Sequence, residues 1–455
     1  MEAAGRRTGG IVGAFGALAA RAGAGRHVVR ALRHRNYQLF FVGQGISLMG
    51  TWMQAMASGW LVRFLVVSPF YQGLVGFCAQ IPAFMFSPLA GVLADHMDRR
   101  RLVIATQALA MVQALVLAAL ALTGTITIWY IVAMSLVLGV VNAFDVPIRQ
   151  SFVVEMVPDK SDISNAIALN SSLFNSARLV GPAVAGAIIA TFGEKLIGAG
   201  VCFALNGLSY IAVIFSLRAM KLNRSNRAAP QISLLANVKA GLDYAMGFAP
   251  LKAILQQVAT MSLVGMSYAV LMPTWAKDIL HGGARTQGFL LSSAGCGALV
   301  GAIYLASRRS VRGLGRLMAI AAFLFGSALI GFSFSRILPL SMVLLGLAGF
   351  GAMISMASSN SLIQTLVDDK MRGRVMSLYT LCFMGTVPFG SLLAGAVASW
   401  LGAPFALAIG GAGCIVAAFL FARKLPHLGR MVHPIYVQLG LAPQASEGAA
   451  IKQRL

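Results

Sequence analysis

The stretch Gly91-Val-Leu-Ala-Asp95-His-Met-Asp-Arg99-Arg100-Arg101-Leu102 lies between two long apolar segments of the chain. It holds two carboxylates and three arginines, although only 11% of the residues of the chain are charged. Such a charge-dense turn between two segments long enough to cross a membrane belongs at a membrane surface. Its spacing also provides the main clue to function.

The composition of the whole chain indicates a protein with many membrane-spanning helices. Of its 455 residues 58% are hydrophobic, and the mean hydropathy is +0.79, which soluble proteins rarely reach. Membrane-length apolar segments recur in a regular series. We therefore predict an all-α polytopic fold with twelve transmembrane helices, near residues 37–64, 70–93, 102–123, 128–155, 163–191, 196–217, 252–275, 286–306, 315–334, 338–366, 373–400 and 404–422.

The twelve segments form two groups of six, separated by a polar stretch. The predicted parts are a basic N-tail (1–35), a six-helix bundle (36–217), a linker with an amphipathic helix (218–250), a second six-helix bundle (251–423) and a C-tail (424–455). The two halves repeat weakly, because residues 151–160 resemble residues 361–370. Tandem pseudo-symmetric halves are typical of transporters.

The distribution of basic residues predicts the orientation. The tails, the linker and the even-numbered loops hold 29 Lys and Arg residues, whereas the other side holds five. By the positive-inside rule both termini and the linker face the cytoplasm. The net charge of +23 is then explained by this rule and by contact with anionic lipids at the cytoplasmic face, and no nucleic-acid partner is expected.

No cofactor, metal or nucleotide site is expected. The five cysteines lie singly within apolar runs and the six histidines fall in tails or loops, so neither has the spacing of a metal site. The chain has no Gly-x4-Gly-Lys-Ser/Thr loop, which disfavours an ATP-driven pump.

The opening stretch is a candidate gate. Gly91 and Asp95 share one helix face, where glycine lets another helix approach and Asp95 can accept hydrogen bonds from its N-terminal amides. Arg99 and Arg100 can pair with Glu155 at a neighbouring helix end. We expect this cluster to latch one state of a rocking protein and to release in the other. The alternative is a solvated basic turn.

The repeat predicts that this latch is one-sided. Gly301 lies 210 residues beyond Gly91, but Leu305 stands in the second half where Asp95 stands in the first. We expect the first half to close against the N-terminal end of the eleventh helix, near Met371–Arg374.

The residues of this stretch match a sequence pattern that is typical of a known family. The pattern Gly-x-Leu-Ala-Asp-x-x-x-Arg-Arg is similar to the signature loop of the major facilitator superfamily, Gly-x-Leu-Ala-Asp-Arg-x-Gly-Arg-Lys/Arg. His96 and Asp98 depart from it, and Asp98 adds a carboxylate. Three further stretches resemble the bacterial exporter branch that includes enterobactin and macrolide efflux proteins: Asn36-Tyr-x-Leu-Phe-x-x-Gly43-Gln44, Asp145-x-Pro147-x-Arg149-Gln150 and Ala177-Arg178-x-x-Gly181-Pro182.

The resemblance implies the major facilitator fold and a secondary transporter in the bacterial inner membrane. Such a protein binds a small-molecule substrate between its halves, exchanges protons and is expected to act as a monomer. Helix five carries Gly181-Pro182-x-x-x-Gly186, which loosely resembles the motif of superfamily antiporters. Proline bends a helix and glycines permit close packing, so we expect a kink there.

Three charged residues fall inside predicted helices, where charge is expensive and usually functional. Asp145 and Arg149 form an acid-before-base pair four residues apart. Asp145 is the first choice for proton coupling, and a permanent structural ion pair is the alternative. Arg178 has no acid nearby in sequence and is expected to face the central cavity, where it would bind an anionic group.

Polar and aromatic residues recur on the first-half helices. They favour either plain helix packing or a mixed cavity suited to an amphipathic organic molecule. The candidates for the cavity are Gln44, Trp52, Gln80, Asn142, Asn170 and Asn206.

We therefore predict a proton-coupled exporter of a small organic molecule, such as a siderophore, a drug or a metabolite. Import of a nutrient is the main alternative. A membrane-embedded lipid-modifying enzyme is less favoured, because the sequence offers no polar constellation for catalysis at the membrane surface. A receptor or scaffold would need an extra domain, for which the linker and tails are too short.

Overall fold

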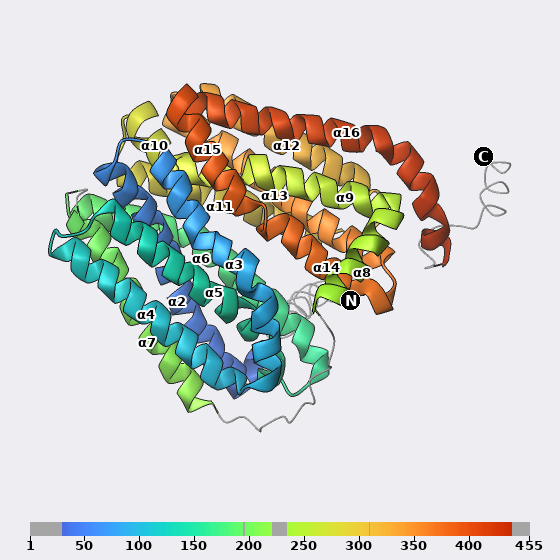
Figure 1. Ribbon diagram of the computed structural model, residues 1–455, viewed down its shortest axis with the longest axis horizontal. Helices are drawn as coiled ribbons and strands as arrows, with labels where there is room; N and C mark the ends of the chain where they lie inside the picture. Colours follow the sequence, from blue (N-terminus) through green and yellow to red (C-terminus); the bar gives the residue numbers. More distant parts are fainter. Residues whose placement is uncertain (1–29, 194–195, 221–233, 309, 439–455) are drawn as a thin grey trace, which may run out of the picture.

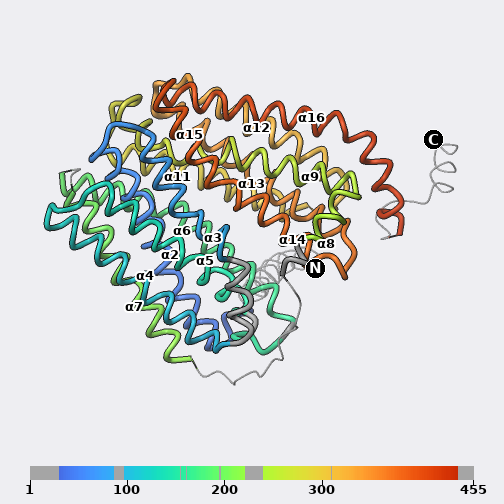
Figure 2. The backbone as a smooth tube through the Cα atoms, viewed as in Figure 1, coloured from blue at the N-terminus to red at the C-terminus, as the bar shows by residue number. Residues whose placement is uncertain are grey.

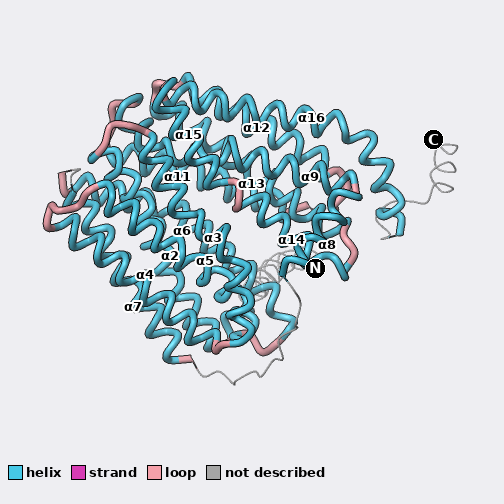
Figure 3. The backbone as a smooth tube through the Cα atoms, viewed as in Figure 1, coloured by secondary structure: helices cyan, strands magenta, loops and turns pink. Residues whose placement is uncertain are grey.

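The computed structural model describes residues 30–193, 196–220, 234–308 and 310–438. Within these ranges it does not describe the side chains of residues 87–96, 154, 160 and 234–238. The described residues form helices joined by short loops, with no strand among them (Figure 3). The predicted all-α polytopic fold is confirmed.

The N-terminal half contains six long helices. Their observed bounds lie within a few residues of the predicted ones. They are α2 (Arg35–Leu65), α3 (Phe70–His96), α4 (Arg99–Leu122), α5 (Ile128–Met156), α6 (Ile163–Thr191) and α7 (Leu196–Ala219), with two short 3-10 turns at η1 (Arg30–Arg33) and η2 (Lys160–Asp162).

The C-terminal half repeats this plan after the short helix α8 (Leu234–Gly247). Its regular helices are α9 (Ala249–Thr260), α11 (Ala284–Ala306), α12 (Leu314–Phe334), α13 (Leu338–Leu366), α14 (Asp369–Met384), α15 (Val387–Leu401) and α16 (Ala403–Gln438). The rod that begins with α9 continues through the π-helix η3 (Met261–Gly265), the 3-10 helix η4 (Met266–Leu271), α10 (Met272–Thr274) and the π-helix η5 (Trp275–Ile279).

Three predicted helices of this half differ from the observed ones. The segment 252–275 is not one regular helix, because α9 ends at Thr260 and a π-helix and a 3-10 helix follow it before Pro273, which itself lacks a backbone donor. The segment 373–400 is broken at Gly385–Thr386, just before Pro388. The segment 404–422 continues to Gln438, into what was predicted to be the C-tail.

Ten helical rods of the described residues are long and apolar enough to cross a membrane. In α3 the part with described side chains, Phe70–Phe86, is apolar, and α2 interrupts its apolar residues with several polar ones. The expected count of twelve is consistent with this arrangement.

Each half packs as its own bundle, and the two bundles meet at one end of the molecule. In Figures 1 and 2 they come together at the upper left, near α10, and diverge toward the lower right. We call the diverging end, with the turns at 97–98, 157–162 and 367–368, the basic end. The end with the turns at 66–69, 280–283 and 335–337 is the opposite end.

Candidate functional site

The charged turn around Asp98 leads directly into α4, which begins at Arg99. The Asp98 carboxylate caps this helix, because its Oδ1 accepts a hydrogen bond from the Arg101 backbone N–H at 3.2 Å. This explains the departure from the family pattern, since a capping carboxylate replaces the flexible glycine. The backbone of α3 runs to His96, but the surroundings of Gly91 and the side chain of Asp95 lie outside what the structure describes.

The arginines of this turn bind within the N-terminal bundle. Arg99 Nη1 donates to Glu155 Oε1 at 2.8 Å, and so joins the start of α4 to the end of α5. Arg100 Nη2 donates to the Arg218 carbonyl oxygen at the end of α7, at 2.6 Å. The structure thus brings Arg99 and Glu155 together and gives Arg100 a different partner.

The expected contact between this turn and the start of α14 is not among the described contacts. Arg372 pairs with Asp369 of its own helix, at 2.6 Å. The Arg374 carbonyl oxygen packs against Gly241 of α8, 3.1 Å from the position of a glycine Cβ. The bundles are apart at this end, so a latch between them would belong to another state of the molecule.

A second charge cluster at the basic end was not predicted. Asp162 accepts contacts from His34 Nε2 at 3.1 Å and from Arg30 Nε at 3.6 Å, which ties the N-terminal turn to the start of α6. Nearby, the Ser161 backbone N–H donates to Asp159 and holds the pKa of that exposed carboxyl below its usual value.

At the opposite end three polar contacts join the bundles, and we call them the interbundle clamp. Arg63 of α2 forms a bidentate ion pair with Asp278 of η5, with Nε donating to Oδ2 at 2.9 Å and Nη2 donating to Oδ1. The other two contacts are Thr274 Oγ1 to Gln72 Oε1 at 3.1 Å and Gln287 Nε2 to the Met56 carbonyl oxygen at 3.3 Å.

Sequence reasoning missed the clamp. Arg63 and Asp278 are 215 residues apart and lie near the ends of their helices, where charge is ordinary. The only available signal was the scarcity of charge on that side, which made each residue there unusual. The Arg63 side chain is 9% exposed and that of Asp278 is 33% exposed, so the pair is largely shielded from water.

Small residues let the bundles approach along the same end. A Cβ on Gly186 of α6 would lie 2.7 Å from the Ala284 carbonyl oxygen of α11, and one on Gly288 of α11 would lie 2.6 Å from that of Pro182. Gly181 instead packs against Trp52 of its own bundle. The predicted kink motif thus serves close packing, and α6 stays one helix through Pro182.

Asp145 lies deep in the N-terminal bundle, 3% exposed. Its Oδ1 accepts from Thr106 Oγ1 and Gln107 Nε2 of α4, each at 2.8 Å. Its Oδ2 lies 3.0 Å from Arg149 Nε, one turn further along α5. The predicted pair is therefore in contact, and two neighbours on α4 complete its surroundings.

Arg178 is half-buried on the face of α6 that meets α11. Its backbone carbonyl lies 3.3 Å from the position of a Cβ on Gly295. Its side chain makes no ion pair or hydrogen bond with the residues that the structure describes. Phe174, one turn earlier on α6, is 45% exposed and packs edge-on against Trp52, with ring centroids 5.6 Å apart.

The other cavity candidates divide into two groups. Gln44 and Asn206 are 3% and 1% exposed and lie inside the bundle, so their side chains do not line an open cavity. The Asn206 amide donates to Gln54 at 2.8 Å in a chain of side-chain hydrogen bonds that fastens α7 to α2. The remaining residues, Gln80, Asn142 and Asn170, are half-buried.

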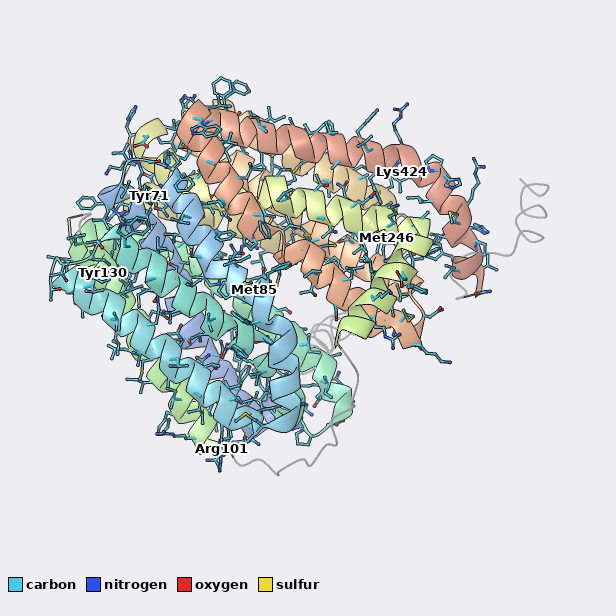
Figure 4. All side chains as sticks on the ribbon, viewed as in Figure 1. Tyr71, Met85, Arg101, Tyr130, Met246 and Lys424 are labelled. Carbon is cyan, nitrogen blue, oxygen red and sulfur yellow. The ribbon has the colours of Figure 1, made fainter. Side chains whose placement is uncertain are left out.

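Aromatic residues also bridge the bundles near mid-helix. Phe389 of α15 packs edge-on against Phe77 and Phe84 of α3, with ring centroids 5.9 and 6.0 Å apart. Phe84 and Phe389 remain 38% and 46% exposed. Met85, labelled in Figure 4, lies beside them on α3 and is 59% exposed. In the part of the chain that the structure describes, no group of three His, Cys, Asp or Glu side chains could hold a metal ion.

Solved structures of transporters share this fold. The nucleoside transporter NupG aligns with a TM-score of 0.65 at 13% identity, over 87% of this chain and 99% of that one. A bacterial homologue of the human lysosomal transporter Spinster, in an inward-facing and occupied conformation, aligns with a TM-score of 0.66 at 13% identity, over 87% and 98%.

Relatives in sequence include named transporters. The chain is 25% identical to the staphyloferrin A transporter of Staphylococcus aureus, over 85% of this chain and 96% of that protein. It is 27% identical to the multidrug efflux pump Tap of Mycobacterium tuberculosis, over 89% and 93%. It is 22% identical to macrolide efflux protein A of Streptococcus pyogenes, over 81% and 92%.

The family profile described as transmembrane secretion effector matches residues 28–433, nearly the whole helical part of the chain. The resemblance noted in the sequence is therefore confirmed, and an enzymatic role is set aside. The chain belongs to the transmembrane secretion effector family of the major facilitator superfamily.

Proposed function

We propose that this protein is a proton-driven exporter that moves a small amphipathic organic molecule by alternating access. The observation that carries the proposal is the interbundle clamp. Among the described residues the polar contacts between bundles gather at the opposite end, as expected for one of two states of a rocking carrier. Two of the relatives are named as efflux proteins, which favours export.

The basic end would face the cytoplasm. It holds the greater share of the Lys and Arg residues, and such an excess marks the cytoplasmic side of the bacterial inner membrane. Both termini would then be cytoplasmic, and the clamp would close the protein toward the outside. In this orientation the structure corresponds to an inward-facing state that is ready to receive a cytoplasmic substrate.

The substrate site would centre on Arg178 and the aromatic pair beside it. A guanidinium without an ion pair in a membrane-spanning helix is costly unless a ligand or water meets it. Phe174 shares its helix face, and Trp52 packs on Phe174. An anionic group on the substrate would bind Arg178, while an apolar portion would lie against the rings.

Proton coupling is proposed for Asp145. A proton on this carboxyl would weaken its pairing with Arg149, which lies 3.0 Å away. It would also change how α5 is fastened to α4 through Thr106 and Gln107. Proton binding would thus alter contacts between helices of the N-terminal bundle, which is what a coupled carrier requires.

The substitution Asp145→Asn tests this assignment. It removes the titratable carboxyl group of this side chain while keeping its size. We expect normal amounts of folded protein and no transport driven by a pH gradient. Asp159→Asn, which changes an exposed carboxyl in a turn, is the matched control and should leave transport unchanged. Proton-driven transport that survives in the Asp145 variant would exclude this residue as the coupling site.

Import of a nutrient by symport is the second candidate function. Uptake into proteoliposomes under an imposed pH gradient separates the two, because an exporter moves substrate against the proton flow and a symporter moves it with the flow. We propose labelled staphyloferrin A and a labelled macrolide as probes, since relatives are named for these molecules.

We further propose that the protein acts as a monomer in contact with anionic lipids.

A further inference from the structure

A basic pocket lies at the basic end of the C-terminal bundle, between two of its helices. It has a volume of about 400 Å³ and lies between the start of α9 and the far part of α16. Its lining residues are Ala249, Lys252, Ala253, Gln256, Lys424, His427 and Leu428. Two lysines, a histidine and an amide thus converge on one concave site that has no acidic residue in its lining.

The two helices that line the pocket also carry charge of one sign only. Neither α9 nor α16 contains an Asp or Glu, so no carboxylate on these helices competes for the two lysines. Lys252 and Lys424 take part in no ion pair among the described residues. Lysine presents a point charge that suits phosphate, and the Gln256 amide can donate a further hydrogen bond to a phosphate oxygen.

The surface next to the pocket is apolar. Val416 and Leu420 precede Lys424 at intervals of four residues and therefore share its helix face. They are 56% and 52% exposed, as expected for side chains that meet lipid tails. A single ligand on this face would meet an apolar stripe and then a cationic pocket. Figure 4 labels Lys424 on the second half of α16, several turns before the helix ends at Gln438.

The fold explains why α16 extends beyond the expected end of the bundle. Leu428 and Val432 are 6% and 7% exposed and pack on the bundle core, whereas Lys424, His427 and Arg430 are exposed. The extension is thus held by one apolar stripe and presents basic side chains on the other. Pro426 lies inside the helix beside the pocket, and α16 curves at this end (Figure 1).

We propose that this pocket binds the phosphate of an anionic phospholipid headgroup, with the acyl chains lying along Val416 and Leu420. The lipid would bridge the start of α9 and the end of α16. The leaflet rests on the proposed function, because the orientation given there makes it the cytoplasmic one. The binding site itself does not depend on the direction of transport.

The test is a lipid titration of the purified full-length protein in detergent, followed by native mass spectrometry. Phosphatidylglycerol is compared with phosphatidylcholine, and inorganic phosphate is added in a separate arm with thermal unfolding as the readout. The pocket variant is Lys252→Gln with Lys424→Gln. The control is Arg316→Gln with Arg430→Gln, which removes the same charge from exposed positions at the same end.

We expect phosphatidylglycerol to bind better than phosphatidylcholine, and the pocket variant to bind it about 30-fold more weakly, as two lost lysine contacts imply. The control variant should bind as the unmodified protein does. Equal weakening in both variants, or equal binding of the two lipids, would overturn the proposal. A stabilisation by inorganic phosphate that matches the lipid's would overturn the lipid as the source. Because no substrate or gradient is present, a failed transport assay leaves this result unaffected.

Discussion

The pair Arg63–Asp278 provides the sharpest prediction, because it joins the bundles only while the opposite end is closed. Arg63→Gln removes one partner and leaves the Asp278 carboxylate without its bidentate donor. The ratio of the closed to the open form at this end should therefore fall. A ligand-free carrier that depends on this contact would then populate its other state.

The size of the effect follows from burial. Removing one partner of a fully buried ion pair costs about 3–5 kcal/mol. The Asp278 side chain is 33% exposed, however, so water screens part of the attraction. An estimate of about 2 kcal/mol for the closed form is therefore more appropriate. This corresponds to a shift of about 30-fold in the ratio of the two forms.

Spin labels across the opposite end measure this ratio. Val67 and Trp400 are 74% and 86% exposed and belong to different bundles, so cysteines at these positions can carry the labels. The exposed native Cys296 is replaced by serine in this background. We expect a short distance in the unmodified protein and a second, longer one in Arg63→Gln and in Asp278→Asn.

Two further variants separate the pair from a general loss of charge. Arg336→Gln removes a cation at the same end whose described contacts, with the Trp275 ring and the Ser333 carbonyl oxygen, stay within the C-terminal bundle, and it should leave the distances unchanged. The exchange of Arg63→Asp with Asp278→Arg should restore most of the short distance. If the single variants keep the distance distribution of the unmodified protein, the Arg63–Asp278 pair does not hold this end closed.

Two other substitutions test the geometry directly. Gly186→Ala would place a Cβ 2.7 Å from the Ala284 carbonyl oxygen, so we expect the same spin labels to move apart and transport to fall. Gly429→Ala is the control and should have neither effect, because a Cβ there meets nothing within 4 Å. Unchanged distances in Gly186→Ala would show that the bundles tolerate a wider spacing. Asp98→Ala removes the cap of α4 and should lower stability by about 1 kcal/mol in thermal unfolding. Thr127→Ala is its control, because Thr127 makes no capping side-chain bond, and equal losses would argue against the cap.

The fold was largely predictable from sequence, because apolar segments of membrane length need no tertiary information to be recognised. The pairing of Arg99 with Glu155 also followed, since both stand at helix ends on the same predicted side of the membrane. The irregular rod after α9 was harder to foresee. Pro273 signals a break, but the π-helix η3 and the 3-10 helix η4 lie against α15 and α16, which are distant in sequence.

Contacts between the two halves could not be predicted from a single sequence. Nothing near Arg63 indicates that Asp278 lies opposite, because the assembly of the two bundles decides it. For Asn206 the difficulty was different. A polar side chain on a membrane helix can line a cavity or fasten two helices, and only its burial at 1% exposure shows that it fastens them.

Proton-driven export can be measured as transport into everted membrane vesicles. The vesicles are energised so that their lumen is acidic, and labelled staphyloferrin A or a labelled macrolide is added outside. We expect at least one probe to accumulate in the lumen, and we expect both a protonophore and the substitution Asp145→Asn to abolish this accumulation. No accumulation of either probe, or movement of a probe out of the lumen together with protons, would contradict proton-driven export.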